Sequence, residues 1–100
     1  MYKQIAIFRT REEIPARSEA SHLSKIMGQI PKGSRVYVDK FTNRWGRICY
    51  VNHNHQDGGE MVLNGKWIRI LNTEVTKIWA KDGSVERRQQ VSLPKRGKKG

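Results

Sequence analysis

Apolar and polar residues alternate with a period of two through several short stretches of the chain. In residues 35–41, Val36 and Val38 alternate with polar or amphipathic neighbours, as expected of a strand that buries one face. The same period predicts further strands at residues 2–8, 45–52 and 66–70. Short alternating segments separated by turn residues are typical of a small all-β sandwich or barrel.

The alternation also assigns faces within each predicted strand. It separates Ile48 and Tyr50 from Arg47, Cys49 and Val51. One of these two faces is therefore expected to lie against the core and the other to lie outside.

Two turn signals connect these segments. The tetrapeptide PKGS at residues 31–34 follows the apolar stretch at 26–30, and its proline presets φ while Gly33 tolerates a positive φ. Asn64-Gly65 predicts a hairpin between residues 61–63 and 66–70, with a type I′ turn that needs positive φ at both central residues.

The polar stretch at residues 9–24 is expected to be a long irregular loop, but it overlaps a second interpretation. Leu23, Ile26, Met27 and Ile30 are spaced as i, i+3, i+4 and i+7, the pattern of an amphipathic helix. With Pro15 before this stripe and Pro31 after it, a helix over residues 16–30 would give an α+β fold. Strand and helix both remain open at residues 26–30.

The last quarter of the chain has a different composition. Two stretches, 75–80 and 85–91, flank the turn sequence KDGS and predict an appended hairpin at residues 75–91. Residues 92–100, SLPKRGKKG, have a composition that cannot bury a core, so a disordered basic tail is expected.

Composition limits the size of the core and the kind of partner. One hundred residues with 36% apolar content suffice for one domain. Twenty Lys and Arg against nine Asp and Glu leave a net charge of +11, and residues 75–100 carry eight of these cations against two acids. Such a field favours anionic partners: nucleic acid, an anionic polymer or an acidic protein surface.

The sequence also indicates a cellular compartment and a role for the single cysteine. No apolar run is long enough to span a bilayer, and the apolar run near the amino terminus is too short for a signal peptide, so a cytoplasmic protein without a membrane partner is expected. Cys49 is the single cysteine, which excludes an internal disulfide, and its setting in a predicted strand favours a packing role.

The order of several motifs resembles the bacterial SH3-like domain, SH3b, over residues of about 4–74. The segment IPARSEAS at 14–21 looks like the family's L-N-V-R-S-G-P-S, and SKIMGQIPKGSRV at 24–36 looks like S-x-V-I-G-x-L-x-K-G-x-x-V. WGRI at 45–48 and NGKWI at 64–68 are similar to the strands G-W-Y-K-V and N-G-x-x-G-W-V. The chain departs from the family where Glu19-Ala20 replaces Gly-Pro, and residues 52–63 form a longer connection.

The resemblance implies a fold and a kind of function. The fold would be a small barrel of about five strands at residues 1–74, with the hairpin and tail as additions. Such domains bind ligands in shallow grooves and are not enzymes. The implied ligand is a peptide, either a bacterial cell-wall peptide or a segment of a partner protein that the chain could also inhibit. No cofactor is implied.

Aromatic and basic residues are the candidate ligand contacts. Large rings offer contact area at low entropic cost, and neighbouring arginines attract acidic groups. The candidates for the binding site are Tyr37, Trp45, Arg47, Tyr50, Trp67 and Arg69, with Arg44 and Lys66 at the rim. As an alternative, nucleic acid would bind through the basic surface and the C-terminal cations Arg87, Arg88, Lys95, Arg96, Lys98 and Lys99.

Catalytic and metal-binding signals are weak. The chain has no nucleophile elbow, paired-carboxylate signature or phosphate-binding glycine loop. His53 and His55, on one side of an extended segment, are the only candidate metal ligands worth naming, with Glu60 able to approach from an opposing strand. We therefore expect a protein without enzyme activity and without a bound metal.

Overall fold

Every regular element of the protein that the structure describes is a β-strand. The computed structural model describes residues 4–53 and 60–83. The strands are β1 Ala6–Thr10, β2 Ile14–Arg17, β3 Ile26–Ile30, β4 Arg35–Thr42, β5 Trp45–Asn52, β6 Glu60–Met61, β7 Trp67–Arg69 and β8 Val75–Ala80. The mainly β prediction is confirmed. These described ranges contain no helix with the length and apolar character needed to cross a membrane.

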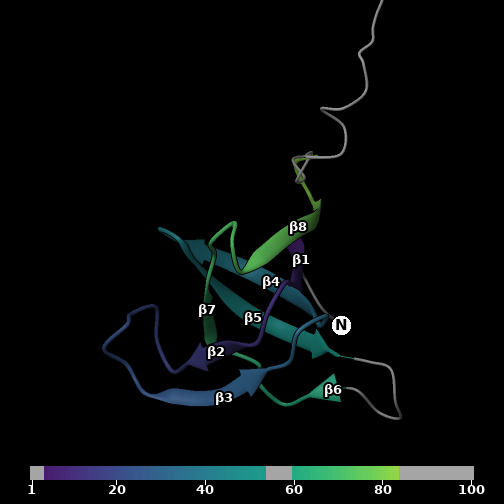
Figure 1. The fold of residues 1–100 in the computed structure, drawn as a ribbon. Helices are drawn as coiled ribbons and strands as arrows, with labels where there is room; N and C mark the ends of the chain where they lie inside the picture. The colour runs from purple at the N-terminus through teal and green to yellow at the C-terminus, as the bar shows by residue number, and fades with distance from the viewer. Residues whose placement is uncertain (1–3, 54–59, 84–100) are drawn as a thin grey trace, which may run out of the picture.

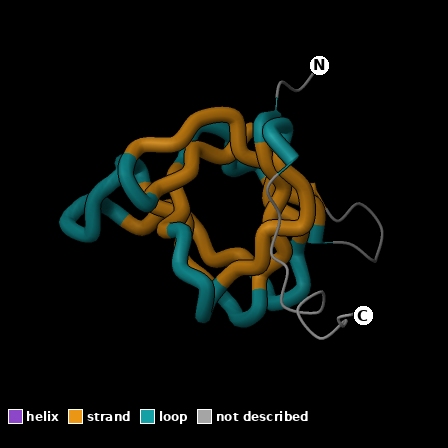
Figure 2. Tube along the Cα trace, turned by 90° about the horizontal axis from the view of Figure 1, so that it is seen from above, coloured by secondary structure: helices purple, strands orange, loops and turns teal. Residues whose placement is uncertain are grey.

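The strands form one antiparallel sheet that curls strongly (Figures 1 and 2). Its order is β3-β2-β7-β5-β4-β1-β8, and β6 pairs with β5 beyond the end of β7. Seen from above, the strands surround a common centre (Figure 2). The hydrogen-bonded path does not close, because β3 and β8 are its two ends.

The core lies on the inner, concave side of this sheet. It is built from small and branched apolar side chains with one large ring, Phe8, as expected where strands face one another across a narrow interior. Its buried members are Ala6, Phe8, Ile14, Ala16, Ile30, Val36, Val38, Ile48, Val51, Leu63, Ile68, Val75 and Ala80. Ile70 packs against them while partly exposed.

The helix alternative over residues 16–30 is wrong, since β2 and β3 occupy its two ends. Ile14 and Ile30 lie opposite each other and are buried, whereas Leu23, in the middle of the supposed apolar stripe, is 96% exposed. The predicted loop over 9–24 is also interrupted by β2. Pro15 is tolerated there because β2 pairs with β7 only at Arg17, so the proline nitrogen interrupts no ladder on that side.

The predicted turn at residues 31–34 is confirmed. Gly33 has φ +85°, and the N–H of Ser34 donates to the carbonyl of Pro31 at 3.3 Å. Thr10, at the end of β1, holds this turn: its hydroxyl donates to the Pro31 carbonyl at 2.7 Å and accepts the Ser34 N–H at 2.9 Å. The turn joins two strands that are not neighbours, since β3 pairs with β2 and β4 pairs with β1 and β5.

The strand predicted at residues 45–52 is confirmed as β5, but its faces were partly wrong. Val38 lies opposite Ile48 and Tyr37 opposite Tyr50, so Cys49 is an extra residue on β5, and Asp39 is a second extra residue on β4. These two bulges break the alternation. Ile48 and Val51 therefore both enter the core, and Tyr50 lies outside with Tyr37.

The predicted hairpin at Asn64-Gly65 is wrong, although a turn is present. Lys66 N–H donates to the Leu63 carbonyl at 3.0 Å, and only Gly65 has positive φ, as in a type II turn. β6 and β7 do not form a pair; both pair with β5, one after the other along it. Gly65 N–H also donates to the Ile48 carbonyl at 2.7 Å, so the turn itself follows β5.

The last described strand, β8, lies beside the first. It pairs with β1 from Ala6–Ala80 to Thr10–Val75, and Val75 and Ala80 join the core. The predicted turn after it is present, with Gly83 at φ +87° and its N–H bonded to the Ala80 carbonyl. The second strand of the predicted hairpin, 85–91, and the predicted tail, 92–100, lie outside the described residues.

Candidate binding site

Four of the predicted binding residues lie in two cross-strand pairs on β5 and β7. Trp45 is opposite Arg69, and Arg47 is opposite Trp67. The pair between them, Gly46 and Ile68, is buried on the core side, so the four residues occupy the other side of the sheet. We call this side of β4, β5 and β7 the outer face. On it, indole and guanidinium groups alternate along both strands.

The two predicted tyrosines lie further along the outer face. Tyr37 and Tyr50 are cross-strand partners, and their rings meet edge to face with centroids 5.2 Å apart. The bulges at Asp39 and Cys49 separate this tyrosine pair from the indole and guanidinium groups. The outer face thus carries all six predicted residues, but in two groups.

One of the arginines on the outer face is partly neutralised. Arg47 Nε donates to Asp39 Oδ1 at 2.9 Å, with the two side chains 40% and 23% exposed. This hydrogen bond, together with the charge of Asp39, raises the pKa of the Arg47 guanidinium above its ordinary value. Arg69 has no such carboxylate partner among the described residues. Arg69 is therefore the better candidate for an anionic ligand.

A loop that joins β2 to β3 folds over Trp45. His22 in this loop meets the Trp45 ring edge to face, with centroids 5.3 Å apart, and accepts a hydrogen bond from Arg69 Nη1. Arg17 Nη1 fixes the loop by donating to the Ser24 carbonyl at 2.7 Å. Trp45 is consequently only 9% exposed, although it lies on the outer face.

Two hollows lie beside the contact between His22 and Arg69, and both are lined by these two residues and Trp45. The smaller, of about 210 Å³, also includes Arg17 and Glu74. The larger and more open one, of about 840 Å³, adds Ala20, Asn43, Arg44 and Leu71. The larger hollow thus has two guanidinium groups and no carboxylate in its lining, which suits an anion. We call it the arginine groove.

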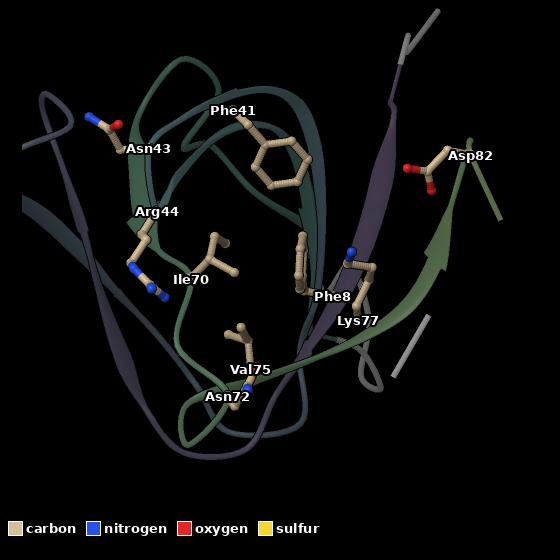
Figure 3. Close-up of a pocket in the computed structure, with 9 residues that line it drawn as sticks. All are labelled: Phe8, Phe41, Asn43, Arg44, Ile70, Asn72, Val75, Lys77 and Asp82. Carbon is tan, nitrogen blue, oxygen red and sulfur yellow. The ribbon is translucent and has the colours of Figure 1, made fainter. Parts of the chain in front are cut away.

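A third hollow opens at one end of the curled sheet (Figure 3). Its volume is about 470 Å³, and we call it the mouth pocket. Phe8, Phe41, Ile70 and Val75 give it an apolar lining, and Asn43, Arg44, Asn72, Lys77 and Asp82 supply polar groups. The Phe8 and Phe41 rings meet edge to face with centroids 6.0 Å apart.

Sequence reasoning missed several residues of these hollows. His22 carries no pattern that marks it, because its role depends on how a loop closes over a distant strand. Phe41 ends an alternating strand and was not singled out in the sequence; it lines the mouth pocket and is 40% exposed. Arg44 was expected only at the rim, and it lines both the arginine groove and the mouth pocket.

The remaining predicted site residues are not brought together by the described part of the chain. Within residues 4–53 and 60–83, no three His, Cys, Asp or Glu side chains converge as a metal site would require. His55 lies outside these ranges, so the expectation that His53 and His55 hold no metal stays a prediction. The basic residues predicted to contact nucleic acid, from Arg87 to Lys99, lie outside as well.

Cys49 is buried at the β5 bulge as a free thiol. Burial raises the pKa of this thiol, and the nearby charge of Asp39 raises it further. A raised thiol pKa disfavours the reactive thiolate at neutral pH.

Comparisons of the chain with protein-family models, with curated proteins and with solved structures gave no match.

Proposed function

We propose that this chain is a non-catalytic binding module that recognises an acidic segment of a peptide or protein partner. In this proposal the curled sheet is a small SH3-like barrel, and the ligand is a bacterial cell-wall peptide or a partner protein that the module could inhibit. The observation that carries the proposal is the alternation of indole and guanidinium groups on β5 and β7 beside the arginine groove.

The chemistry of these side chains supports binding. A guanidinium presents forked donors that match a carboxylate, and it stays protonated at neutral pH, so it serves poorly as a general base. The partly exposed Trp67 ring adds apolar contact area at low entropic cost, whereas Trp45 lies under the loop between β2 and β3. All four residues stand on paired strands, whose backbone is fixed before a ligand arrives. Little ordering free energy is then lost on binding.

A labelled peptide rich in Asp and Glu tests this proposal by fluorescence anisotropy. Arg69→Ala is expected to weaken binding about tenfold, as loss of a charge-assisted contact does. Arg35→Ala is the matched control, because Arg35 is exposed on β4 opposite Arg9, away from the arginine groove. Equal losses in both variants would show attraction by net charge alone and contradict a defined site.

The partner class requires a separate experiment. Sedimentation with peptidoglycan and pull-down from a bacterial lysate distinguish a wall peptide from a protein partner. Retention that is lost in Arg69→Ala supports the proposal in either case. No enrichment in both experiments counts against it.

Nucleic acid is the second candidate, and the same outer face favours it. Bases can stack on the partly exposed Trp67 ring and on guanidinium planes, and the net charge of +11 attracts phosphates. Titration of single-stranded DNA and RNA at two salt concentrations, with and without residues 93–100, tests this candidate. Affinity that falls steeply with salt and depends on Trp67 supports it, while binding that is absent or insensitive to salt contradicts it.

A further inference from the structure

The mouth pocket is a further hollow, apart from the outer face, that combines an apolar wall with polar groups. Figure 3 shows Phe41, Phe8, Ile70 and Val75 around a common space, with Arg44 and Lys77 at its sides. These residues come from β1, β4, β8 and the segments next to β5 and β7. The space lies at the end of the sheet where the turn between β4 and β5 and the chain after β7 come together.

Phe41 is the unusual member of this lining. Its partner across the ladder is Gly46, which has no side chain to cover the ring. Phe8 beside it is 1% exposed, whereas Phe41 remains 40% exposed. A half-exposed ring beside an apolar hollow retains apolar area that a ligand can remove from water, which is favourable.

Asn43 and Arg44 connect the mouth pocket to the arginine groove, because both residues line both hollows. Asn43 has φ +56°, a left-handed conformation that an Asn in a tight turn tolerates. The Arg44 carbonyl accepts the Ile70 N–H at 2.6 Å, which holds this turn against the end of β7. Among the described residues the Arg44 guanidinium has no carboxylate partner.

We propose that the mouth pocket receives a large apolar side chain of the partner peptide, next to an acidic residue whose carboxylate binds Arg44. This inference rests on the proposed peptide-binding function and specifies its ligand. Charge complementarity selects the occupant, because the Arg44 guanidinium, without a carboxylate partner in the described part of the chain, lies between an apolar pocket and a basic groove. The carboxylate in the lining, Asp82, lies near Lys77 and across the pocket from Arg44 (Figure 3). The recognised sequence is therefore an acidic residue beside an aromatic or large aliphatic one.

Two acidic peptides that differ only in one Phe or Ala beside the acid test the inference by anisotropy. The Phe peptide is expected to bind about tenfold more tightly, since burial of a ring is favourable by at least this factor. Phe41→Gln removes the apolar wall and is expected to abolish the preference. Ile78→Gln is the matched control, because Ile78 is a partly exposed residue of β8 outside the pocket lining. Circular dichroism checks the fold of each variant.

The outcomes separate this inference from the proposed function. Equal binding of both peptides, with Arg69 still required, overturns the inference and leaves the binding module intact. Binding of neither peptide overturns both. If instead free 3-phenylpropionate shifts the methyl resonances of Ile70 and Val75 while neither peptide binds, the occupant is a small amphiphile and the peptide assignment is overturned. A chain that dimerises through Phe41 in sedimentation likewise overturns it, in favour of a second copy.

Discussion

Arg69 on β7 donates a hydrogen bond to the imidazole of His22, and this contact holds the loop between β2 and β3 across Trp45. A guanidinium can only donate, so the imidazole accepts through an unprotonated nitrogen. The covering of Trp45 thus depends on a polar contact between a strand and a loop.

Removing the imidazole is expected to expose Trp45. In a chain where Trp67 and Trp79 are replaced by Phe, His22→Ala should increase quenching of the remaining indole by acrylamide, because the loop loses its contacts with Trp45 and Arg69. Leu23→Ala is the control from the same loop, since Leu23 is 96% exposed. Unchanged quenching in His22→Ala would mean that other residues hold the loop closed.

The hydroxyl of Thr10 is expected to stabilise the turn at residues 31–34. Thr10→Val keeps the shape of the side chain but leaves the Pro31 carbonyl and the Ser34 N–H each without one partner. The free energy of unfolding should fall by about 1–3 kcal/mol, the net contribution of two hydrogen bonds. Urea unfolding measures it. Thr10→Ser should recover most of the loss, and Thr42→Val, at an exposed position, should have little effect.

Gly46 is expected to be required for packing. A Cβ at this position would lie 3.0 Å from Val38 Cγ1 and 3.3 Å from Ile70 Cδ1, so Gly46→Ala should cost about 1–3 kcal/mol through overpacking. In a double-mutant cycle, Gly46→Ala combined with Val38→Ala should lose less stability than the sum of the two single losses, because the smaller side chain at position 38 relieves the clash. Strict additivity would exclude this steric explanation.

A contrasting cost is expected at Gly33. A Cβ there meets nothing within 4 Å, but φ is +85°. Gly33→Ala should therefore cost about 1–2 kcal/mol by backbone strain alone. In the same urea titration, the stability lost in Gly33→Ala should add to the loss caused by any substitution at a neighbouring position, unlike the loss in Gly46→Ala.

Stability is expected to decline at alkaline pH in part through Cys49. Burial, and then the charge of Asp39, raises the pKa of the thiol above its ordinary value of 9.0. The folded chain retains a proton that the unfolded chain releases, so this contribution is complete below pH 9.0 and is lost as pH rises through the folded pKa. Unfolding free energies measured on both sides of pH 9.0 should fall less in Cys49→Ala than in the unchanged chain.

A second measurement isolates the role of Asp39. Asp39→Asn should lower the thiol pKa and accelerate alkylation of Cys49 by iodoacetamide, since the thiolate is the reacting form. Glu74→Gln removes a charge elsewhere and serves as the control. Equal acceleration in both variants would point to net charge instead of proximity.

Local patterns predicted the strands well where pairing is regular. Val36 and Val38 alternate as the sequence requires, and the bounds of β5 match the predicted 45–52. The predicted assignment of β5 side chains to two faces was wrong beyond Cys49, because a bulge adds a backbone residue without any side-chain signal. The prediction of a hairpin at Asn64-Gly65 was wrong because the two flanking segments, β6 and β7, each pair with β5 and not with one another. This pairing is a tertiary effect.

The candidate site was predictable to a similar degree. The shared face of Trp45, Arg47, Trp67 and Arg69 follows from alternation along β5 and β7. Tyr50 lies on the same face only because of the bulge at Cys49, which alternation did not predict. The hollows could not be predicted, because they depend on where His22 lies after a loop closes and on which end of the sheet leaves Phe41 uncovered. Contacts between distant segments leave no periodic trace in a single sequence.

The place of β1 between β4 and β8 sets the order in which the chain can fold during synthesis. Ala6 is paired with Val38 on one side and with Ala80 on the other. Both edges of β1 are therefore paired only after β8, nearly the whole described chain later, has been synthesised. Pairings this distant form slowly. Of the described strands, the earliest is completed last, and until then its free edge needs protection from other chains.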